Sequence, residues 1–237
     1  MIAVFKRDFL SYFKTPIGYV FMAAFLAANG GTFALMTLQA STSSTGTYFT
    51  TMMIISAVLT PFLTMKLFSE ERKTKTEQLL LTSPASIGGI VAGKFFAAYA
   101  VYLITFLIGT LNFATLYKFS AENEIQSGVL FGSSVALVLA AAAFISIGVF
   151  VSALTENQLI AAIGSIGIMA LFLVISLLNS YIPFEWLRKV LSWISIYSRF
   201  SYFNYGVFDF AALLYYASVC FVFLFLTVRV YERRRWA

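Results

Sequence analysis

The chain has 237 residues, of which 60% are hydrophobic and 11% are charged, and its mean hydropathy is +0.87. A soluble domain carries about 25% charged residues on average, so this composition predicts an integral membrane protein. The net charge of +6 comes from basic residues that flank apolar stretches, which favours anionic lipid headgroups over nucleic acid as the counter-charge. With no His and with Cys220 as the only Cys, the sequence excludes an intrachain disulfide and a His/Cys metal site.

Residues 1–15 are expected to form an amphipathic elbow helix on the membrane surface. Apolar side chains recur at helical spacing over residues 2–14, whereas Lys6 and Arg7 lie off that face. Pro16 ends this helix and suits the first turn of the next one. Two compatible interpretations remain open: a basic anchor that fixes the topology, and an elbow that couples to a cytoplasmic partner.

Six apolar stretches reach the length of about 20 residues that a helix needs to cross the hydrocarbon layer. They cover residues 17–38, 48–68, 87–117, 128–153, 159–178 and 209–230. The third is long enough that we expect it to tilt or to begin at the interface. The sequence therefore predicts an all-α polytopic membrane protein with six transmembrane helices in a single domain over residues 1–237.

Lys and Arg are distributed unevenly between the two ends of the predicted spans. An even number of spans puts both termini on one side, and that side collects 12 of the 16 basic residues. The opposite side holds only Lys118, Arg188, Lys189 and Arg199. Because basic residues accumulate in cytoplasmic loops, we expect both termini and the loop between the second and third spans to be cytoplasmic.

This cytoplasmic loop, residues 69–85, concentrates the charges of the chain. Glu70, Glu71, Arg72 and Lys73 are followed by Lys75, Glu77 and the apolar run Leu79-Leu80-Leu81. Charged loops on membrane proteins are usually just solvated, but mixed charges beside an apolar face are typical of an amphipathic helix that docks on another protein. We therefore expect a partner protein to contact residues 69–85.

The stretch Gly88–Lys94 matches the first seven positions of a phosphate-binding loop, but two features exclude that function. Phe95 replaces the Ser or Thr that would hold magnesium, and the stretch lies inside an apolar helix instead of after a strand. Gly89 and Gly93 are better explained as a close-packing pattern of membrane helices. Lys94 is expected to extend its side chain back to the cytoplasmic interface.

The predicted spans lack acidic or basic residues away from their ends, which argues against ion coupling and intramembrane catalysis. The sequence shows no paired carboxylates, no Ser/His dyad and no buried basic cluster. We therefore expect no catalytic residue, no cofactor site and no metal site in this chain. The energy for any work must then come from a partner.

Residues 179–208, between the fifth and sixth spans, are too polar to cross the membrane but contain ten aromatic residues. Leu187, Val190, Leu191 and Ile194 repeat at helical spacing, which predicts a short amphipathic helix on the outer side. It is either an interfacial anchor of the kind that aromatic belts provide, or an outer gate or re-entrant helix pair. As a gate, it would close the exit path with Leu187, Leu191 and Ile194.

Short motifs in a fixed order resemble ABC-2 type transporter permeases, specifically the gliding-motility (Gld-type) group. They are Thr15–Tyr19, Phe68–Lys73, Thr76, Leu79–Pro84, Gly93–Phe95, Leu154–Gln158, Gly206–Asp209 and Arg233–Trp236. Such permeases often carry Gly-Thr-x-Glu after the acidic pair. Here Lys75 stands in place of that Gly and Gln78 in place of the Glu, with Glu77 beside it.

The resemblance implies two six-span permease copies, expected to be identical, on two separate ABC ATPase subunits in the bacterial cytoplasmic membrane. ATP and Mg would bind in the ATPases, and this chain would bind no cofactor and no nucleic acid. Contact with the ATPase is assigned to Glu70, Glu71, Arg72, Lys73, Thr76, Glu77 and Leu80, with a lesser contact at Glu156 in the turn 154–158. Similar systems often include a further, partly extracytoplasmic membrane subunit.

The function expected from these patterns is that of the permease subunit of an ATP-driven ABC-2 type transporter, an exporter. The alternative is a permease-like subunit that transmits ATPase cycles to extracytoplasmic partners without moving a solute. An intramembrane enzyme is disfavoured because the sequence offers no acid/base constellation.

Overall fold

The computed structural model describes residues 1–38, 45–82, 85–114, 127–179, 184–204 and 209–236, and every regular element in these ranges is a helix. Six of these helices are long and apolar enough to span a membrane. They are Pro16–Thr37, Gly46–Lys73, Ile87–Ala114, Gly128–Leu154, Gln158–Ser176 and Phe210–Arg235. The six predicted spans are thereby confirmed; the end of the third, 115–117, lies outside the described residues.

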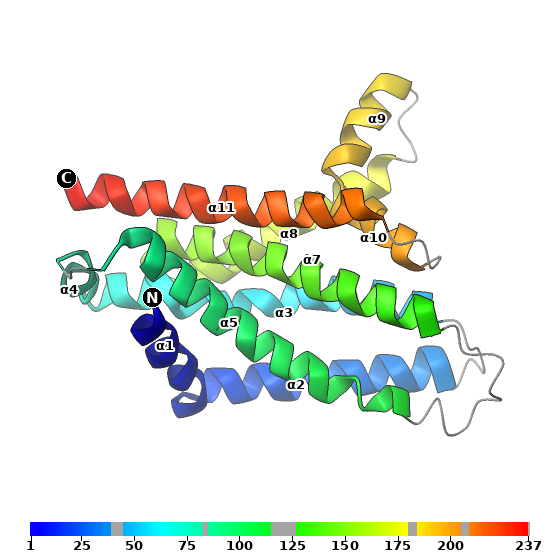
Figure 1. Cartoon of the computed structure of the whole chain (residues 1–237), viewed down its shortest axis with the longest axis horizontal. Coiled ribbons are helices and arrows are strands. Elements are labelled where there is room, and N and C mark those ends of the chain that lie inside the picture. Colours follow the sequence, from blue (N-terminus) through cyan, green and yellow to red (C-terminus); the bar gives the residue numbers. More distant parts are fainter. Residues whose placement is uncertain (39–44, 83–84, 115–126, 180–183, 205–208, 237) are drawn as a thin grey trace.

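The spans belong to α2 (Pro16–Phe33) with its π-helical extension η1 (Ala34–Leu38), α3 (Gly46–Lys73), α5 (Ile87–Gly109), α7 (Ser127–Leu154), α8 (Gln158–Asn179) and α11 (Phe210–Trp236). The shorter helices are α1 (Ile2–Lys14), α4 (Glu77–Leu81), α9 (Glu185–Ile194) and α10 (Ile196–Asn204). Figure 1 shows that α1, α4 and both chain termini gather at one end of the bundle, whereas α9 and α10 lie at the other. We call the former the charged end.

The centre of the bundle is the contact between α3 and α7. α3 also packs against α2 and α8, and α7 against α11. Small residues on α7 allow this close approach: Ala140 and Ala143 are fully buried, and a side chain at Gly148 would overlap the hydroxyl of Thr64 on α3. In the most apolar 18-residue stretch of α7, about two thirds of the residues are buried, whereas in that of α11 only 17% are. α11 therefore turns most of its apolar surface away from the bundle.

A polar network connects helices in the half of the bundle that lies away from the charged end. The Asn29 amide on α2 donates to the Tyr48 hydroxyl on α3 at 2.8 Å, and the Asn112 amide donates to Asn29 Oδ1 at 2.7 Å. Asn29 is fully buried. Because a buried polar group must find its partners inside the protein, these bonds fix α2, α3 and the segment after α5 relative to one another.

The corner between α1 and α2 forms where the sequence predicts it. Thr15 is extended (φ −112°, ψ 150°), as expected of a residue before proline, and Pro16 occupies the first turn of α2. At this corner Gly18 approaches the carbonyl of Tyr12 so closely that a side chain there would overlap it. The helix predicted over residues 2–14 is confirmed, and its location on a membrane surface stays a prediction.

The outer segment is helical, as predicted, and consists of two helices. α10 is seated on the bundle, because Phe200 and Phe203 are fully buried and Tyr216 of α11 donates to the carbonyl of Ile196 at 3.0 Å. α9 projects away from the other helices (Figure 1), with Trp186 and Trp193 well exposed.

The proposed gate residues are only partly visible in this segment. Leu191 is half-buried, and the side chains of Leu187 and Ile194 lie outside the described residues, as do residues 180–183 and 205–208. The outer gate therefore stays a prediction.

Replacing Gly148 with Ala should lower the stability of the protein by about 1–3 kcal/mol, because the added methyl overlaps Thr64 and forces α3 and α7 apart. Thermal unfolding of the purified protein in detergent measures this loss. Gly167→Ala on α8 is the matched control, since a side chain there meets no atom within 4 Å. Equal melting temperatures for the two variants would contradict the packing described here.

Candidate functional site

At the charged end, α3 continues beyond its apolar part and carries the first half of the predicted partner-binding loop, residues 69–85. The helix ends at Lys73, where the Thr74 backbone N–H donates to the Glu70 carbonyl at 2.9 Å. Lys75 then adopts a left-handed conformation with φ of 58°, and the chain turns into α4. We call residues 69–85 the coupling segment; residues 83–84 lie outside the described part.

A buried ion-pair cluster fastens the coupling segment to two other helices. Lys94 of α5 is 1% exposed, and its ammonium lies 2.8 Å from Glu71 Oε1 on α3 and 3.2 Å from Asp8 Oδ2 on α1. The same ammonium donates to the carbonyl of Leu67 at 2.6 Å. The expectation that the Lys94 side chain reaches the membrane interface is not met, because its ammonium is buried among these groups. α1 covers Lys94 and brings Asp8 to it, so the ammonium is neutralised inside the protein.

Arg7 completes this cluster from the solvent side. Its guanidinium lies 2.8 Å from Asp8 Oδ1 and also pairs with Glu71. Burial alone would lower the pKa of Arg7, but the two neighbouring carboxylates raise it above its ordinary value. The cluster thus balances two cations, Arg7 and Lys94, against two acids, Asp8 and Glu71, which is the condition for burying such charges.

Close backbone packing brings α1 over Lys94. A Cβ atom at Gly93 of α5 would lie 3.0 Å from the Met1 carbonyl and 3.3 Å from the Val4 side chain. Gly89 faces the same turn of α1, with Met1 nearby. The two glycines therefore form a close-packing site, as the sequence indicates, and the helix that packs there is α1.

A second set of contacts fixes α1 to α3 near the corner. Tyr12 is fully buried and donates its hydroxyl to the Leu63 carbonyl at 2.6 Å. Burial, reinforced by the charges of Asp8 and Glu70, raises the pKa of Tyr12 well above its ordinary value, so the phenol remains a donor. The Lys66 ammonium lies 4.5 Å from the centre of the Tyr12 ring and donates to Thr15 Oγ1 at 2.8 Å.

The turn between α7 and α8 is joined to the coupling segment by Arg72. Its guanidinium donates to the Leu154 carbonyl at 2.9 Å and pairs with Glu156 at 2.9 Å. Beneath this contact, the buried hydroxyl of Ser152 accepts the backbone N–H groups of Phe68 and Ser69 at 3.2 Å each. The two segments assigned to the partner contact, 69–85 and 154–158, are therefore one continuous surface.

The end of α11 is joined to α4. Arg234 pairs with Glu77 at 3.2 Å and donates to the Ala153 carbonyl at 2.8 Å. One turn earlier, Tyr231 packs on Phe68 of α3 with ring centres 4.7 Å apart. The coupling segment is thus bound at three places: to α1 and α5, to the α7–α8 turn, and to α11.

These contacts divide the predicted partner-binding residues into two groups. Glu71, Arg72, Glu77 and Glu156 are engaged in ion pairs within the chain, and Leu80 packs against the core. Glu70, Lys73 and Thr76 are exposed, and so is Leu79, which is 73% exposed. Sequence reasoning chose Leu80 where the outward residue is Leu79.

The sequence analysis did not predict the ion pairs of Asp8 and Arg234. A single acidic residue within the basic N-terminal helix was a detectable signal for Asp8.

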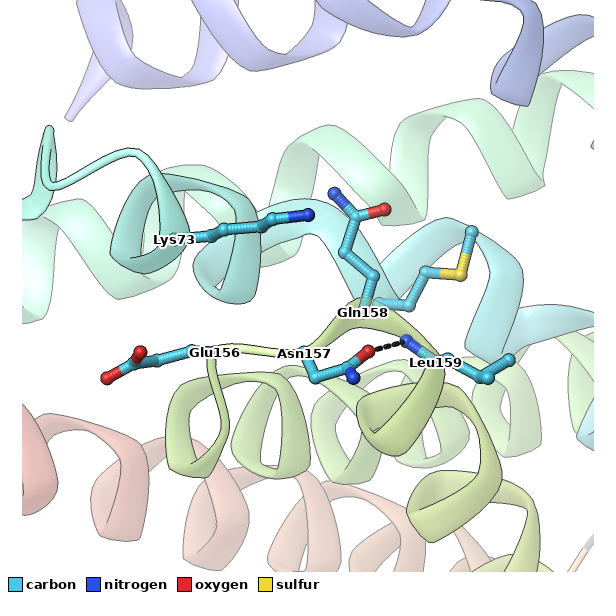
Figure 2. Close-up of a pocket in the computed structure, with 6 residues that line it drawn as sticks. Lys73, Glu156, Asn157, Gln158 and Leu159 are labelled. Atoms are coloured by element: carbon cyan, nitrogen blue, oxygen red, sulfur yellow. Dashed lines mark hydrogen bonds between the residues drawn. The ribbon is translucent and has the colours of Figure 1, made fainter.

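Figure 2 shows a pocket of about 560 Å³ between the end of α3 and the start of α8. Lys73 extends from α3 toward Gln158, whereas Glu156 points away. Asn157 caps the start of α8 by accepting the Leu159 backbone N–H at 2.9 Å. A polar recess therefore lies beside the continuous surface formed by the two segments.

The bundle with six candidate spans defines a multi-pass membrane protein. The chain belongs to the ABC-2 family of transporter proteins, whose family model matches residues 17–236. Membership implies a permease subunit that associates with ABC ATPase subunits. A comparison with curated proteins finds none that matches this chain. Within the part of the chain that the structure describes, no group of three or more His, Cys, Asp or Glu could hold a metal ion.

Replacing Lys94 with Met should destabilise the protein by about 3 kcal/mol or more, because it leaves buried acidic charge uncompensated. The thermal unfolding midpoint and the yield of monodisperse protein measure this loss. Lys73→Met, at an exposed position, is the control. The double variant Lys94→Met/Glu71→Met should lose less than the sum of the two single variants; strict additivity would contradict direct coupling of the two charges.

Replacing Lys75 with Gly should stabilise the protein by about 1 kcal/mol, because glycine adopts a positive φ without the steric cost that a side chain brings. Lys75→Ala removes the same charge but keeps the Cβ atom, so it should give no such gain. The difference between the two unfolding midpoints isolates the backbone effect, and its absence would show that Lys75 is not strained.

Proposed function

We propose that this chain is the permease subunit of an ATP-driven ABC-2 type exporter in the bacterial cytoplasmic membrane. Separate ABC ATPase subunits bind ATP and Mg and perform the hydrolysis, and the chain itself catalyses no reaction. Both termini and the coupling segment face the cytoplasm. Family membership and the concentration of 12 of the 16 basic residues on the side of the coupling segment support this proposal.

One observation carries the mechanism: the coupling segment is bound to the bundle from within while an apolar side chain faces outward. Leu79 is an exposed apolar residue of α4, and Lys73 and Glu70 are exposed on the end of α3. An apolar anchor surrounded by charges is the usual composition of a protein–protein contact. We assign Leu79 as the central contact with the ATPase.

Force applied at Leu79 reaches the membrane through α3. α3 extends from Gly46 to Lys73 with Pro61 in its interior, so the exposed residues Glu70 and Lys73 share one helix with the core of the bundle, and Leu79 is joined to that helix by the turn at Lys75. The Lys94 cluster adds α1 and α5 to it, and Arg234 adds α11. When the ATPases close on ATP, we expect these helices to move together relative to the second permease copy.

The complete transporter is proposed to contain two copies of this chain. α2, α8 and α11 expose apolar surface that must meet lipid or another subunit. The outer gate formed by Leu187, Leu191 and Ile194, membership in the Gld-type group, and a further extracytoplasmic subunit belong to the same proposal.

The second candidate function is a subunit that transmits ATPase cycles to an outer partner without moving a solute. The observation that favours it is α9, which projects from the bundle with Trp186 and Trp193 exposed. Reconstituted complexes distinguish the two functions. ATP-dependent movement of a solute into vesicles supports export. Hydrolysis that changes the accessibility of α9 while every tested solute stays in place supports transmission.

Labelling of intact cells with a membrane-impermeant maleimide, in a Cys220→Ser background, tests this topology. A cysteine at Thr74, which is exposed at the charged end, should remain unlabelled until the cells are permeabilised. A cysteine at Glu185, exposed on α9, should be labelled from outside. Labelling of Thr74→Cys in intact cells would overturn the orientation.

Replacing Leu79 with Asp should abolish binding of the cognate ABC ATPase and its stimulation by the permease, because an unpaired charge then occupies the centre of the contact at a cost of about 2–5 kcal/mol. The measurement is co-purification and ATPase activity of the co-expressed complex. Gln78→Asp adds the same charge at the neighbouring exposed position and should have a smaller effect. Full association of the Leu79 variant, with an unchanged unfolding midpoint, would exclude α4 as the docking element.

A further inference from the structure

A groove runs along the outer surface of the protein where α1 crosses α5. It encloses about 510 Å³ and presents only apolar atoms. α1 contributes Met1, Ile2 and Phe5, and α5 contributes Phe96, Tyr99, Ala100 and Leu103. The Tyr99 hydroxyl donates to the carbonyl of Val138 on α7, so the polar atom of that side chain is engaged within the bundle.

The direction of the groove matches that of a membrane lipid. Its α5 wall extends from Phe96 to Leu103, which is about 10 Å along the helix axis at 1.5 Å per residue. It therefore runs parallel to a membrane span, and it begins next to Lys94 at the charged end. The groove thus occupies the leaflet on the side of the charged end, where an acyl chain lies along the same direction.

The apolar face of α1 requires a covering. Ile2 is 80% exposed and Met1 58% exposed, although both lie on a helix whose opposite side carries the ion-pair cluster. Phe5, Phe9 and Phe13 form a continuous row of ring contacts along α1, with centres 5.7 Å and 5.2 Å apart. These rings form an apolar row along α1 that borders the groove at Phe5.

An exposed basic residue lies on α1, one helical turn from a residue that lines the groove. Lys6 is exposed and stands four residues after Ile2, so it lies one helical turn from Ile2, at the edge of the apolar face of α1. Arg7, in contrast, is engaged with Asp8 and Glu71. An exposed ammonium beside an apolar channel offers a counter-charge for the phosphate of a lipid headgroup.

We propose that the α1–α5 groove is a specific site for an anionic phospholipid, with one acyl chain along Phe96–Leu103 and the headgroup phosphate at Lys6. The bound lipid fills the space between the elbow helix and the bundle. It thereby holds α1 against α5 on the side opposite to the Lys94 cluster. The site requires neither the ATPase nor a transported solute, so its test is independent of the proposed function.

The experiment uses the full chain in nanodiscs with a phospholipid that carries a photoreactive diazirine in its acyl chain. Mass spectrometry should locate adducts on Phe5, Phe96 or Leu103 in excess over the exposed faces of α2, α8 and α11. Unlabelled phosphatidylglycerol should compete for these adducts better than phosphatidylethanolamine. Lys6→Gln should reduce that preference by about fivefold, the effect of one basic residue near an anionic surface.

Ala100→Trp fills the groove and should remove the groove adducts. Leu107→Trp, at an exposed position two turns further along α5 and outside the groove, should leave them unchanged. Uniform labelling of all lipid-facing helices in the wild-type protein would overturn the proposal. Adducts that appear only in the monomeric protein would also overturn the proposal, because a second copy of the chain would then cover the groove in the dimer.

Discussion

The burial of one ammonium group, Lys94, sets the arrangement of the whole charged end. A lone buried cation costs several kcal/mol, and here it is offset only because Glu71 and Asp8 converge on it from two other helices. Asp8 reaches it only if α1 folds back across α5, which the absence of side chains at Gly89 and Gly93 permits. The elbow helix, the end of α3 and the start of α5 therefore form one unit.

Buried ion pairs of this kind contribute more to geometry than to stability, since apolar residues of similar size often stabilise a protein as well or better. An apolar interface between α1, α3 and α5 would allow these helices to slide. An ammonium that contacts Glu71, Asp8 and the Leu67 carbonyl at once has a single position that satisfies all of them. Such a unit can transmit a displacement at the coupling segment to the inner helices without dissipating it in side-chain adjustments.

Hydropathy and charge distribution were sufficient to predict the six spans, the helix over residues 2–14 and the helical outer segment, because these depend on local composition. The contacts of the charged end were not predictable in this way. Lys94 and Asp8 are far apart in the sequence, and their pairing depends on how α1 packs. Likewise Leu79 and Leu80 are equivalent in composition, and only the orientation of α4 exposes the first and packs the second, half-buried, against the core.

Lys75 occupies a left-handed backbone conformation in the turn between α3 and α4. The resemblance to ABC-2 permeases leads us to expect Gly there, and the positive φ at Lys75 is a conformation that glycine adopts readily. In this chain the turn between α3 and α4 therefore places a side chain in a conformation that favours glycine. The neighbouring ion pairs of Arg72 and Glu77 are formed across helices and hold the turn from both sides. These tertiary contacts hold the turn, and Lys75 adds an exposed positive charge at the tip of the coupling segment.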